Sequence, residues 1–291
     1  MNAARTLTLC ADDFGLTPGI SSGISDLARA RRLSWVSCLT NGAHWQASAA
    51  IAADWPASAE LGLHINLTEG RPLSPALAKL WPHFPALRVL MARAYLGRLP
   101  GSALQLEIEA QLAAFRAAVG SVPRFVDGHQ HVHHLPGVRE LVLGLVAGID
   151  PRPVVRNTAH ILGQGFQLKR WVIASSGARG LRRELLRGNF AHNTCLLGVY
   201  DFRARDYGRL MRGWLARLPA QGGVLFCHPA RPEDGFSDLT TAARLREFAY
   251  LSGDRFLEDL AQANVTLARA DHAPSGRPQA PQPNVQTRFA L

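Results

Sequence analysis

The sequence predicts an α/β protein in which about seven parallel strands are covered by helices and closed, or nearly closed, into a barrel. Three observations predict this fold. Short apolar runs alternate with amphipathic helical patterns along most of the chain, as in βα units. The 291 residues suit one large α/β barrel. No G-x-G-x-x-G motif follows a strand, and neither a P-loop nor an internal repeat is present.

The strands are expected where apolar, β-branched or aromatic residues run together and stop at polar residues or glycine. The fourth range includes the histidine-rich stretch that directly follows the apolar residues of the strand. In chain order the expected strands begin and end at 7–11, 33–39, 60–64, 125–134, 153–156, 193–198, 223–229 and 265–267.

The helices are expected where apolar residues recur at helical spacing. Thr17 and Pro18 supply a cap and a first-turn proline for the first helix, and Leu104, Ile108 and Leu112 form one stripe of the third. The expected helices span 20–31, 44–53, 103–119, 138–146, 207–218, 242–250 and 254–263.

Two stretches interrupt the alternation and are expected to form insertions at the rim formed by the carboxyl ends of the strands. Residues 68–101 contain five prolines with aromatic residues between them, which is typical of a lid or substrate wall. Trp81 and Tyr95 could stack on sugar rings or simply pack the lid. Residues 160–190 are helical and basic in character. We expect one domain over 1–271 and a disordered tail over 272–291, which is rich in Pro, Gln, Asn and Ser.

The net charge of +10 raises the possibility of a nucleic-acid partner, but its distribution argues against one. Only Lys79 and Lys169 are lysines, so 32 basic residues minus 2 leaves 30 arginines, scattered over many expected helices. The densest group could bind an anionic partner, although a solvated helix face is the favoured interpretation. That group consists of Arg179, Arg182, Arg183 and Arg187.

Hydropathy and cysteine usage indicate a cytoplasmic protein. No apolar run approaches the ~20 residues that span a bilayer, and residues 1–10 are too short for a signal peptide before the first strand. The four cysteines lie in apolar strand-like runs without paired spacing, so we expect buried free thiols in a reducing compartment. They are Cys10, Cys38, Cys195 and Cys227.

Asp12 and Asp13 follow the first expected strand, at the end where α/β barrels place their sites. Adjacent carboxylates repel each other unless a cation or a shared proton relieves them. The pair could instead cap the next helix, but Thr17 and Pro18 already supply that start. We therefore expect Asp12 and Asp13 to serve a functional site.

The third and seventh expected strands both end in histidine, at His64 and His228. A single histidine after an apolar run is more often structural than functional. Because the carboxyl ends of parallel strands meet at one rim, these two histidines and the Asp pair should lie together. This shared position favours a functional interpretation.

Residues 125–134 contain four of the eleven histidines in the chain. If the segment is extended, alternate side chains share one face, which would carry Asp127, His129, His131 and His133. Neutral imidazole is the commonest metal ligand, and a neighbouring carboxylate can fix its tautomer. The alternative is a surface histidine-rich turn that binds nothing. One aspartate with two histidines would leave coordination positions open, as catalytic metal sites do.

Four separated motifs resemble those of the YdjC-like carbohydrate deacetylases, which include chitooligosaccharide deacetylase. They are residues 11–15 (ADDFG), 62–64 (GLH), 127–133 (DGHQHVH) and 227–229 (CHP), in the same order. The resemblance runs from about Leu7 to about Leu267. It implies a (β/α) barrel of the glycoside hydrolase/deacetylase type that acts on N-acetylated sugars with one divalent metal ion. The family often has serine and histidine at the positions of Gly128 and Gln130.

Carried over motif by motif, the resemblance implies that Asp13, His64 and His129 hold the metal. It further implies that Asp12 is the general base and His228 the acid that protonates the leaving amine. An acid in that role should have a pKa near the working pH. Four further residues are expected to bind substrate or support the site, namely Asp127, His131, His133 and Arg156.

The chemistry of the residues is consistent with amide hydrolysis, which needs an activated water, a stabilised oxyanion and a proton for the amine. Two alternatives remain open: a metal-dependent phosphoester hydrolase whose arginines clamp phosphate, and a non-catalytic metal-binding or sugar-binding protein. Two imidazoles and a carboxylate favour Zn²⁺ or cobalt, whereas the family resemblance admits Mg²⁺. The expected partner is a small N-acetylated sugar, with no nucleic acid, no membrane span and possible homodimer formation.

Overall fold

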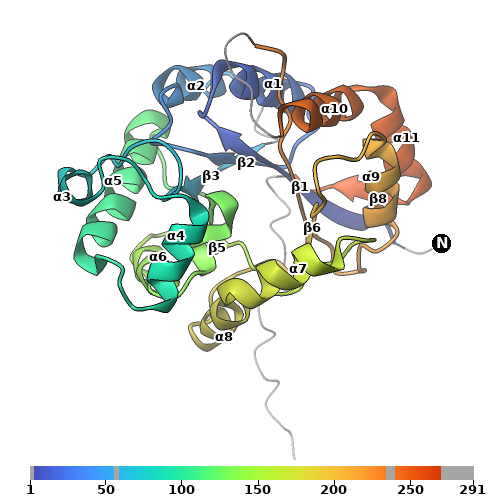
Figure 1. Ribbon diagram of the computed structural model, residues 1–291. Coiled ribbons are helices and arrows are strands. Elements are labelled where there is room, and N and C mark those ends of the chain that lie inside the picture. Colours follow the sequence, from blue (N-terminus) through green and yellow to red (C-terminus); the bar gives the residue numbers. More distant parts are fainter. Residues whose placement is uncertain (1–2, 56–58, 234–239, 270–291) are drawn as a thin grey trace, which may run out of the picture.

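The strands of the described residues form one parallel sheet that curls toward a barrel (Figure 1). This computed structural model describes residues 3–55, 59–233 and 240–269. The strand order is β5-β4-β3-β2-β1-β7-β6, and β8 pairs with the first residues of β1 on the edge opposite β7. The strands are β1 (Arg5–Phe14), β2 (Trp35–Cys38), β3 (Glu60–Ile65), β4 (Phe125–Gly128), β5 (Val154–Val155), β6 (Leu196–Leu197), β7 (Gly223–Cys227) and β8 (Val265–Leu267).

The two edges of the sheet approach each other without forming a full ladder. An isolated parallel bridge joins Val155 of β5 to His192, which precedes β6, and a second joins Ile161 to Leu196. The predicted barrel of about seven strands is therefore confirmed, with an incomplete seam between β5 and β6. Every strand that precedes a candidate site residue points its carboxyl end toward the same rim.

Helices surround the sheet (Figure 1). Thr17 caps the first of them, because its hydroxyl accepts a hydrogen bond from the Ile20 N–H at 3.2 Å, and Pro18 opens its first turn. Asp12 and Asp13 therefore have no capping role. The covering helices are α1 (Pro18–Arg29), α2 (Trp45–Ala52), α5 (Gly101–Val119), α6 (Val138–Ala147), α9 (Tyr207–Leu215), α10 (Thr241–Ser252) and α11 (Asp254–Gln262).

The two predicted insertions are helical. The first carries α3 (Pro75–Leu80) and α4 (Leu87–Tyr95), and the second carries α7 (Gln167–Ile173), a π-helical turn (Ala174–Ala178) and α8 (Arg179–Arg187). Trp81 is buried in the main hydrophobic core, so it packs the insertion and does not offer a face to a sugar.

The arginines of α8 are exposed and the cysteines are buried. The four arginines of α8 are exposed, as expected of a solvated helix face. All four cysteines are buried free thiols, as predicted. No helix within the described ranges is long and apolar enough to cross a membrane. The expected tail at 272–291 lies outside the described residues.

The prediction of an extended 125–134 segment is wrong. β4 ends at Gly128, and His129–His134 form a tight 3₁₀ turn in which Gln130 and His131 adopt left-handed backbone angles (φ 52° and 64°). The turn folds back onto Gly128, where a Cβ atom would lie 2.8 Å from the backbone nitrogen of His133. The absence of a side chain at Gly128 therefore permits the turn, and the histidines do not share one strand face.

The sixth strand is shorter than predicted, because Asn157 and Asn193 replace part of its ladder. The Asn193 side chain accepts a hydrogen bond from the Asn157 N–H at 2.7 Å and donates to the Asn157 carbonyl at 2.9 Å. Only Leu196–Leu197 pair regularly with β7. These buried side chains satisfy backbone groups at the seam that strand pairing leaves unpaired.

A buried polar network fixes the chain that leaves β3. The Gln111 side chain of α5 accepts from the Asn66 N–H at 3.0 Å and donates to the Asn66 carbonyl at 2.7 Å. It also donates to Glu107, whose other carboxylate oxygen accepts from the Ser74 N–H at 2.7 Å. Gln111, Glu107 and Asn66 are fully buried, so the loop after β3 is held by hydrogen bonds shielded from water.

We predict that Gln111→Leu destabilises the fold. The substitution leaves both backbone groups of Asn66 buried without their partner, and each unsatisfied group costs about 1–3 kcal/mol. Urea unfolding should show a loss of about 2–6 kcal/mol. Gln105→Leu, on the exposed face of the same helix, is the matched control and should change stability by about 0.5 kcal/mol or less. Equal stability of the two variants would contradict the importance of this network.

Candidate active site

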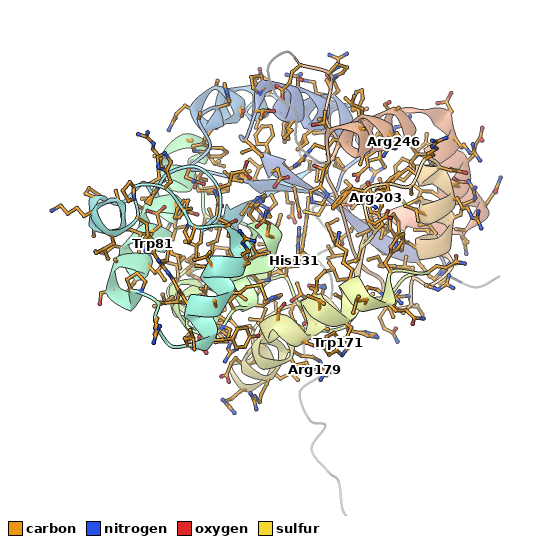
Figure 2. The ribbon with its side chains drawn as sticks, viewed as in Figure 1. Trp81, His131, Trp171, Arg179, Arg203 and Arg246 are labelled. Atoms are coloured by element: carbon orange, nitrogen blue, oxygen red, sulfur yellow. The ribbon has the colours of Figure 1, made fainter. Side chains whose placement is uncertain are left out.

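A cavity of about 340 Å³ opens at the carboxyl ends of the strands. His131, labelled near the centre of Figure 2, belongs to its wall. The wall combines the predicted polar residues with apolar and aromatic side chains. The lining comprises Asp12, Asp13, His64, Glu69, Leu87, Gly128, His129, Gln130, His131, Lys169, Ile173, Gly198, Val199, Tyr200, Phe202, Phe226, His228, Thr240 and Arg244.

A β-bulge explains how two adjacent aspartates reach the same cavity. Neighbouring side chains in a regular strand point to opposite faces. The register between β1 and β2 shifts between Ala11 and Phe14, and Asp13 has a left-handed backbone with φ 73°. The bulge redirects the Asp13 side chain, so both carboxylates are buried at the site.

Asp13, His64 and His129 come together from the ends of three strands. Their nearest donor atoms all lie within 4.8 Å of one another, and all three residues are buried. The Asp13 carboxylate lies 3.4 Å from Nε2 of His64 and 2.9 Å from Nδ1 of His129. Two imidazoles and one carboxylate in this arrangement fit a divalent cation and leave further coordination positions toward the cavity.

Asp127 orients one of these histidines. Its Oδ1 lies 2.6 Å from Nδ1 of His64 and accepts from the Ser37 hydroxyl at 2.5 Å. This carboxylate leaves Nε2 of His64 facing Asp13, as outer carboxylates do in metal sites with histidine ligands. Asp127 therefore contacts His64 on the side of the ring away from Asp13. Of the two roles expected from the sequence, substrate binding or support of the site, these contacts favour support.

Arg156 contacts a second group of side chains, formed by the Cys10 thiol and the carboxylates of Asp12 and Asp127. Its guanidinium binds both oxygens of Asp12, at 2.7 and 2.8 Å. It also lies 2.5 Å from Asp127 and donates to the Cys10 sulfur at 2.9 Å. Arg156 is completely buried, so this internal cation relieves the repulsion between the two carboxylates.

The electrostatics of the cluster favour charged forms. Burial alone would lower the pKa of His64, but the Asp127 carboxylate raises it to about 10. Burial likewise opposes a charged His129, whose pKa is nevertheless raised by Asp13. Burial would raise the pKa of Asp13, yet Arg244 and His129 hold it well below its usual range. A cation that displaces the imidazole protons would preserve this charge balance.

His228 follows β7 and lines the cavity, as predicted, but its protonation differs from expectation. Burial, reinforced by Arg244, lowers the pKa of His228 to about 4, so the imidazole is neutral near pH 7. Burial thus disfavours the protonated imidazole that a direct proton donor would need, in contrast to the expected pKa near the working pH. The rings of Phe202 and Phe226 lie 5.5 Å from the His228 ring, and Nδ1 has no hydrogen-bond partner among the described residues.

The remaining predicted histidines lie apart from the Asp13 cluster. His131 faces the cavity beside Phe226, with ring centroids 5.4 Å apart. His133 is fully buried, and its Nε2 lies 2.9 Å from the Arg156 carbonyl, so it supports the arginine. Burial lowers the pKa of His133 to about 4.

Sequence reasoning missed three ionisable residues of the site. Arg244 of α10 donates to Asp13 at 2.7 Å, and Glu69 lies 3.1 Å from Nε2 of His129. Glu247 of α10 accepts from the His228 N–H at 2.6 Å and from the Tyr200 hydroxyl. Arg244 and Glu247 lie within a helix, where the sequence carries no signal for them. Glu69 was detectable only as a charged residue five positions after His64.

The fold and the cavity define an α/β-barrel protein with a buried aspartate and histidine cluster at the carboxyl ends of its strands. The family model described as YdjC-like protein matches residues 6–262. The chain therefore belongs to the YdjC-like family, and the resemblance inferred from the four motifs is confirmed.

Curated relatives match most of the chain. The carbohydrate deacetylase of Mus musculus is 41% identical over an alignment of 305 positions, gaps included, that covers 94% of this chain and 96% of the relative. The carbohydrate deacetylase of Homo sapiens is 32% identical, with 94% and 92% covered. The chitooligosaccharide deacetylase of Serratia marcescens is 32% identical over 234 residues, which cover 78% of this chain and 82% of the relative.

A solved structure supports the fold. It is the crystal structure of an Enterococcus faecalis protein provisionally named for cellobiose-phosphate cleavage, which superposes with a TM-score of 0.72. The match covers 92% of this chain and 98% of the other, at 19% identity. At that identity the similarity bears on the fold alone.

Proposed function

We propose that this protein is a metal-dependent hydrolase that removes the N-acetyl group from an amino sugar or a short oligosaccharide. The observation that carries the proposal is the buried cluster of Asp13, His64 and His129 in the wall of the cavity. Membership of the YdjC-like family, and relatives named as carbohydrate deacetylases, supply the substrate class.

In this proposal Asp13, His64 and His129 hold one divalent ion, Mg²⁺ or Zn²⁺. When bound, such an ion lowers the pKa of water and polarises the amide carbonyl. Asp127 holds the His64 ring in the orientation that presents Nε2. Arg244 fixes the second carboxylate oxygen of Asp13.

Asp12 is the proposed general base that accepts a proton from the attacking water. It lines the cavity, and the two hydrogen bonds from Arg156 fix the plane of its carboxylate. A carboxylate held in this way can take the proton without a change of rotamer. Arg156 is thus a positioning residue for Asp12.

His228 is the proposed donor of a proton to the leaving nitrogen. Its low pKa leaves the imidazole neutral, and a neutral imidazole can accept a proton at one ring nitrogen while it donates from the other. In this proposal the proton that Asp12 removes from the water passes to His228 and from His228 to the leaving nitrogen, so that Asp12 returns to the carboxylate and His228 to the neutral imidazole. Tyr200, Phe202 and Phe226 form the apolar wall beside it, which suits an acetylated sugar ring.

A phosphoester hydrolase is less well supported by the site. The arginines that could clamp a phosphate near the cluster are engaged by carboxylates, Arg156 by Asp12 and Asp127 and Arg244 by Asp13. A purely structural or binding role would require neither Asp12 nor His228 at the cavity. The amide hydrolase proposal uses both.

The first test is metal-dependent release of free amine from N-acetylglucosamine and its short oligomers. Activity should disappear with a chelator and return with added Mg²⁺ or Zn²⁺. His64→Ala and His129→Ala should lower both metal content and turnover, because each removes a ligand. His44→Ala, which changes an exposed histidine, is the control and should keep both. Full metal occupancy in both ligand variants would contradict the assignment.

A second prediction separates the two aspartates. Asp12→Asn keeps the shape of the side chain but removes its basicity, so turnover should fall about 10²–10⁴-fold. Metal content, measured by elemental analysis, should stay at the wild-type level, whereas Asp13→Asn should lose metal. The opposite pattern of metal loss would show that the two roles are reversed.

A third prediction concerns His228. His228→Ala should slow the hydrolysis of an N-acetyl sugar by about 10²–10⁴-fold. An acetyl ester with a good leaving group needs no proton, so its hydrolysis should slow much less. Rates on the two substrates, with metal content measured in parallel, distinguish proton donation from structural support. Equal losses on both substrates together with metal release would indicate a ligand or a structural residue.

A further inference from the structure

The His129 ring lies between two carboxylates that contact opposite nitrogens. Nδ1 faces Asp13 at 2.9 Å, and Nε2 faces Glu69 at 3.1 Å. Asp13 is buried at the base of the cavity, whereas the Glu69 side chain is 44% exposed at its wall. The two contacts together fix the position and the rotation of the ring.

His64 shows the same arrangement with its nitrogens exchanged. Its Nε2 faces Asp13 at 3.4 Å, and its Nδ1 faces Asp127 at 2.6 Å. An imidazole that ligates a metal must present an unprotonated nitrogen, and its remaining N–H needs an acceptor. Asp127 provides that acceptor for His64, and Glu69 is the carboxylate in the corresponding position for His129.

The backbone of Glu69 is held more firmly than its exposure suggests. Asn66 accepts a hydrogen bond from the Glu69 N–H at 3.1 Å and donates to the Glu69 carbonyl at 2.7 Å. Asn66 is itself fixed by the buried Gln111 of α5. These hydrogen bonds fix the backbone position from which the Glu69 side chain reaches Nε2 of His129.

We propose that Glu69 is a positioning residue that accepts the Nε2–H of His129 and thereby presents Nδ1 as the metal-binding atom. The inference rests on the proposed function, in which Asp13, His64 and His129 hold the ion. It adds a second carboxylate–histidine pair beside Asp127 and His64. It also assigns a role to the loop that follows β3.

Zn²⁺ titration of the metal-free, full-length protein tests the proposal. Glu69→Ala should weaken Zn²⁺ binding about 10–100-fold, the usual effect of removing an outer partner of a ligand. Glu69→Gln should stay within about 3-fold of wild type, because the amide oxygen still accepts the hydrogen bond. Glu109→Ala, an exposed glutamate on α5, is the matched control and should bind as wild type does.

Long-range ¹H–¹⁵N spectra of the Zn²⁺-loaded protein supply a readout that a merely structural role would not change. Wild type and Glu69→Gln should show His129 protonated at Nε2, with a slowly exchanging proton. In Glu69→Ala this resonance should be lost to exchange. Through-bond correlations from the assigned backbone of His129 to its ring identify the resonance.

The outcomes separate this inference from the proposed function. If wild type binds no Zn²⁺ and releases no amine, the proposed function fails and the inference fails with it. If wild type does both and Glu69→Ala binds Zn²⁺ equally well, the role of Glu69 alone is overturned. Equal weakening in Glu69→Gln and Glu69→Ala with the His129 resonance retained would make Glu69 a ligand, which also overturns it.

Discussion

The buried guanidinium of Arg156 is the interaction on which the rest of the site depends. It lies between Asp12 and Asp127, at 2.5–2.8 Å from their carboxylate oxygens. Two carboxylates without water or a cation would repel each other or take up protons. Breaking such a buried pair by removing one partner costs about 3–5 kcal/mol. Arg156 therefore allows β1, β4 and β5 to bring charged residues to one place.

The charge balance continues from Arg156 to the opposite side of the cavity. Asp127 contacts both Arg156 and His64, and His64 contacts Asp13. Asp13 is held in turn by Arg244 from α10. Each charged residue along this path from Asp12 to Arg244 thus has a partner of opposite sign, which is the condition under which an interior of low dielectric tolerates charge. Arg156 and Asp127 therefore connect Asp12, the proposed base, to the proposed ligand His64 through direct contacts.

Irregular backbone, in addition to regular strands, aims the side chains of the site. The bulge in β1 turns Asp13 beside Asp12, and the left-handed turn at Gln130 and His131 separates His131 and His133 from His129. Such conformations occur at functional sites because the surrounding structure compensates for their cost. Here the compensation includes the ion pairs of Asp13 and the contact of His133 with the Arg156 carbonyl.

The sequence by itself determined the barrel and the ends of its strands at which polar residues gather. Hydrophobic periodicity depends on local spacing, and parallel strands with helical crossovers necessarily place their carboxyl ends on one rim. This rule predicts that one rim carries Asp12, Asp13, His64, Asp127, Arg156 and His228. The resemblance of the four motifs predicts the family.

Only the tertiary structure decided which of these residues touch and in what ionisation state. The partners Arg156–Asp12, Asp127–His64 and Glu69–His129 are 144, 63 and 60 residues apart in the chain. No local pattern encodes such pairings. The low pKa of His228 likewise follows from burial and from Arg244, which approaches from a helix. Burial and the sum of surrounding charges are properties of the packed molecule, because each depends on every element that closes around the cavity.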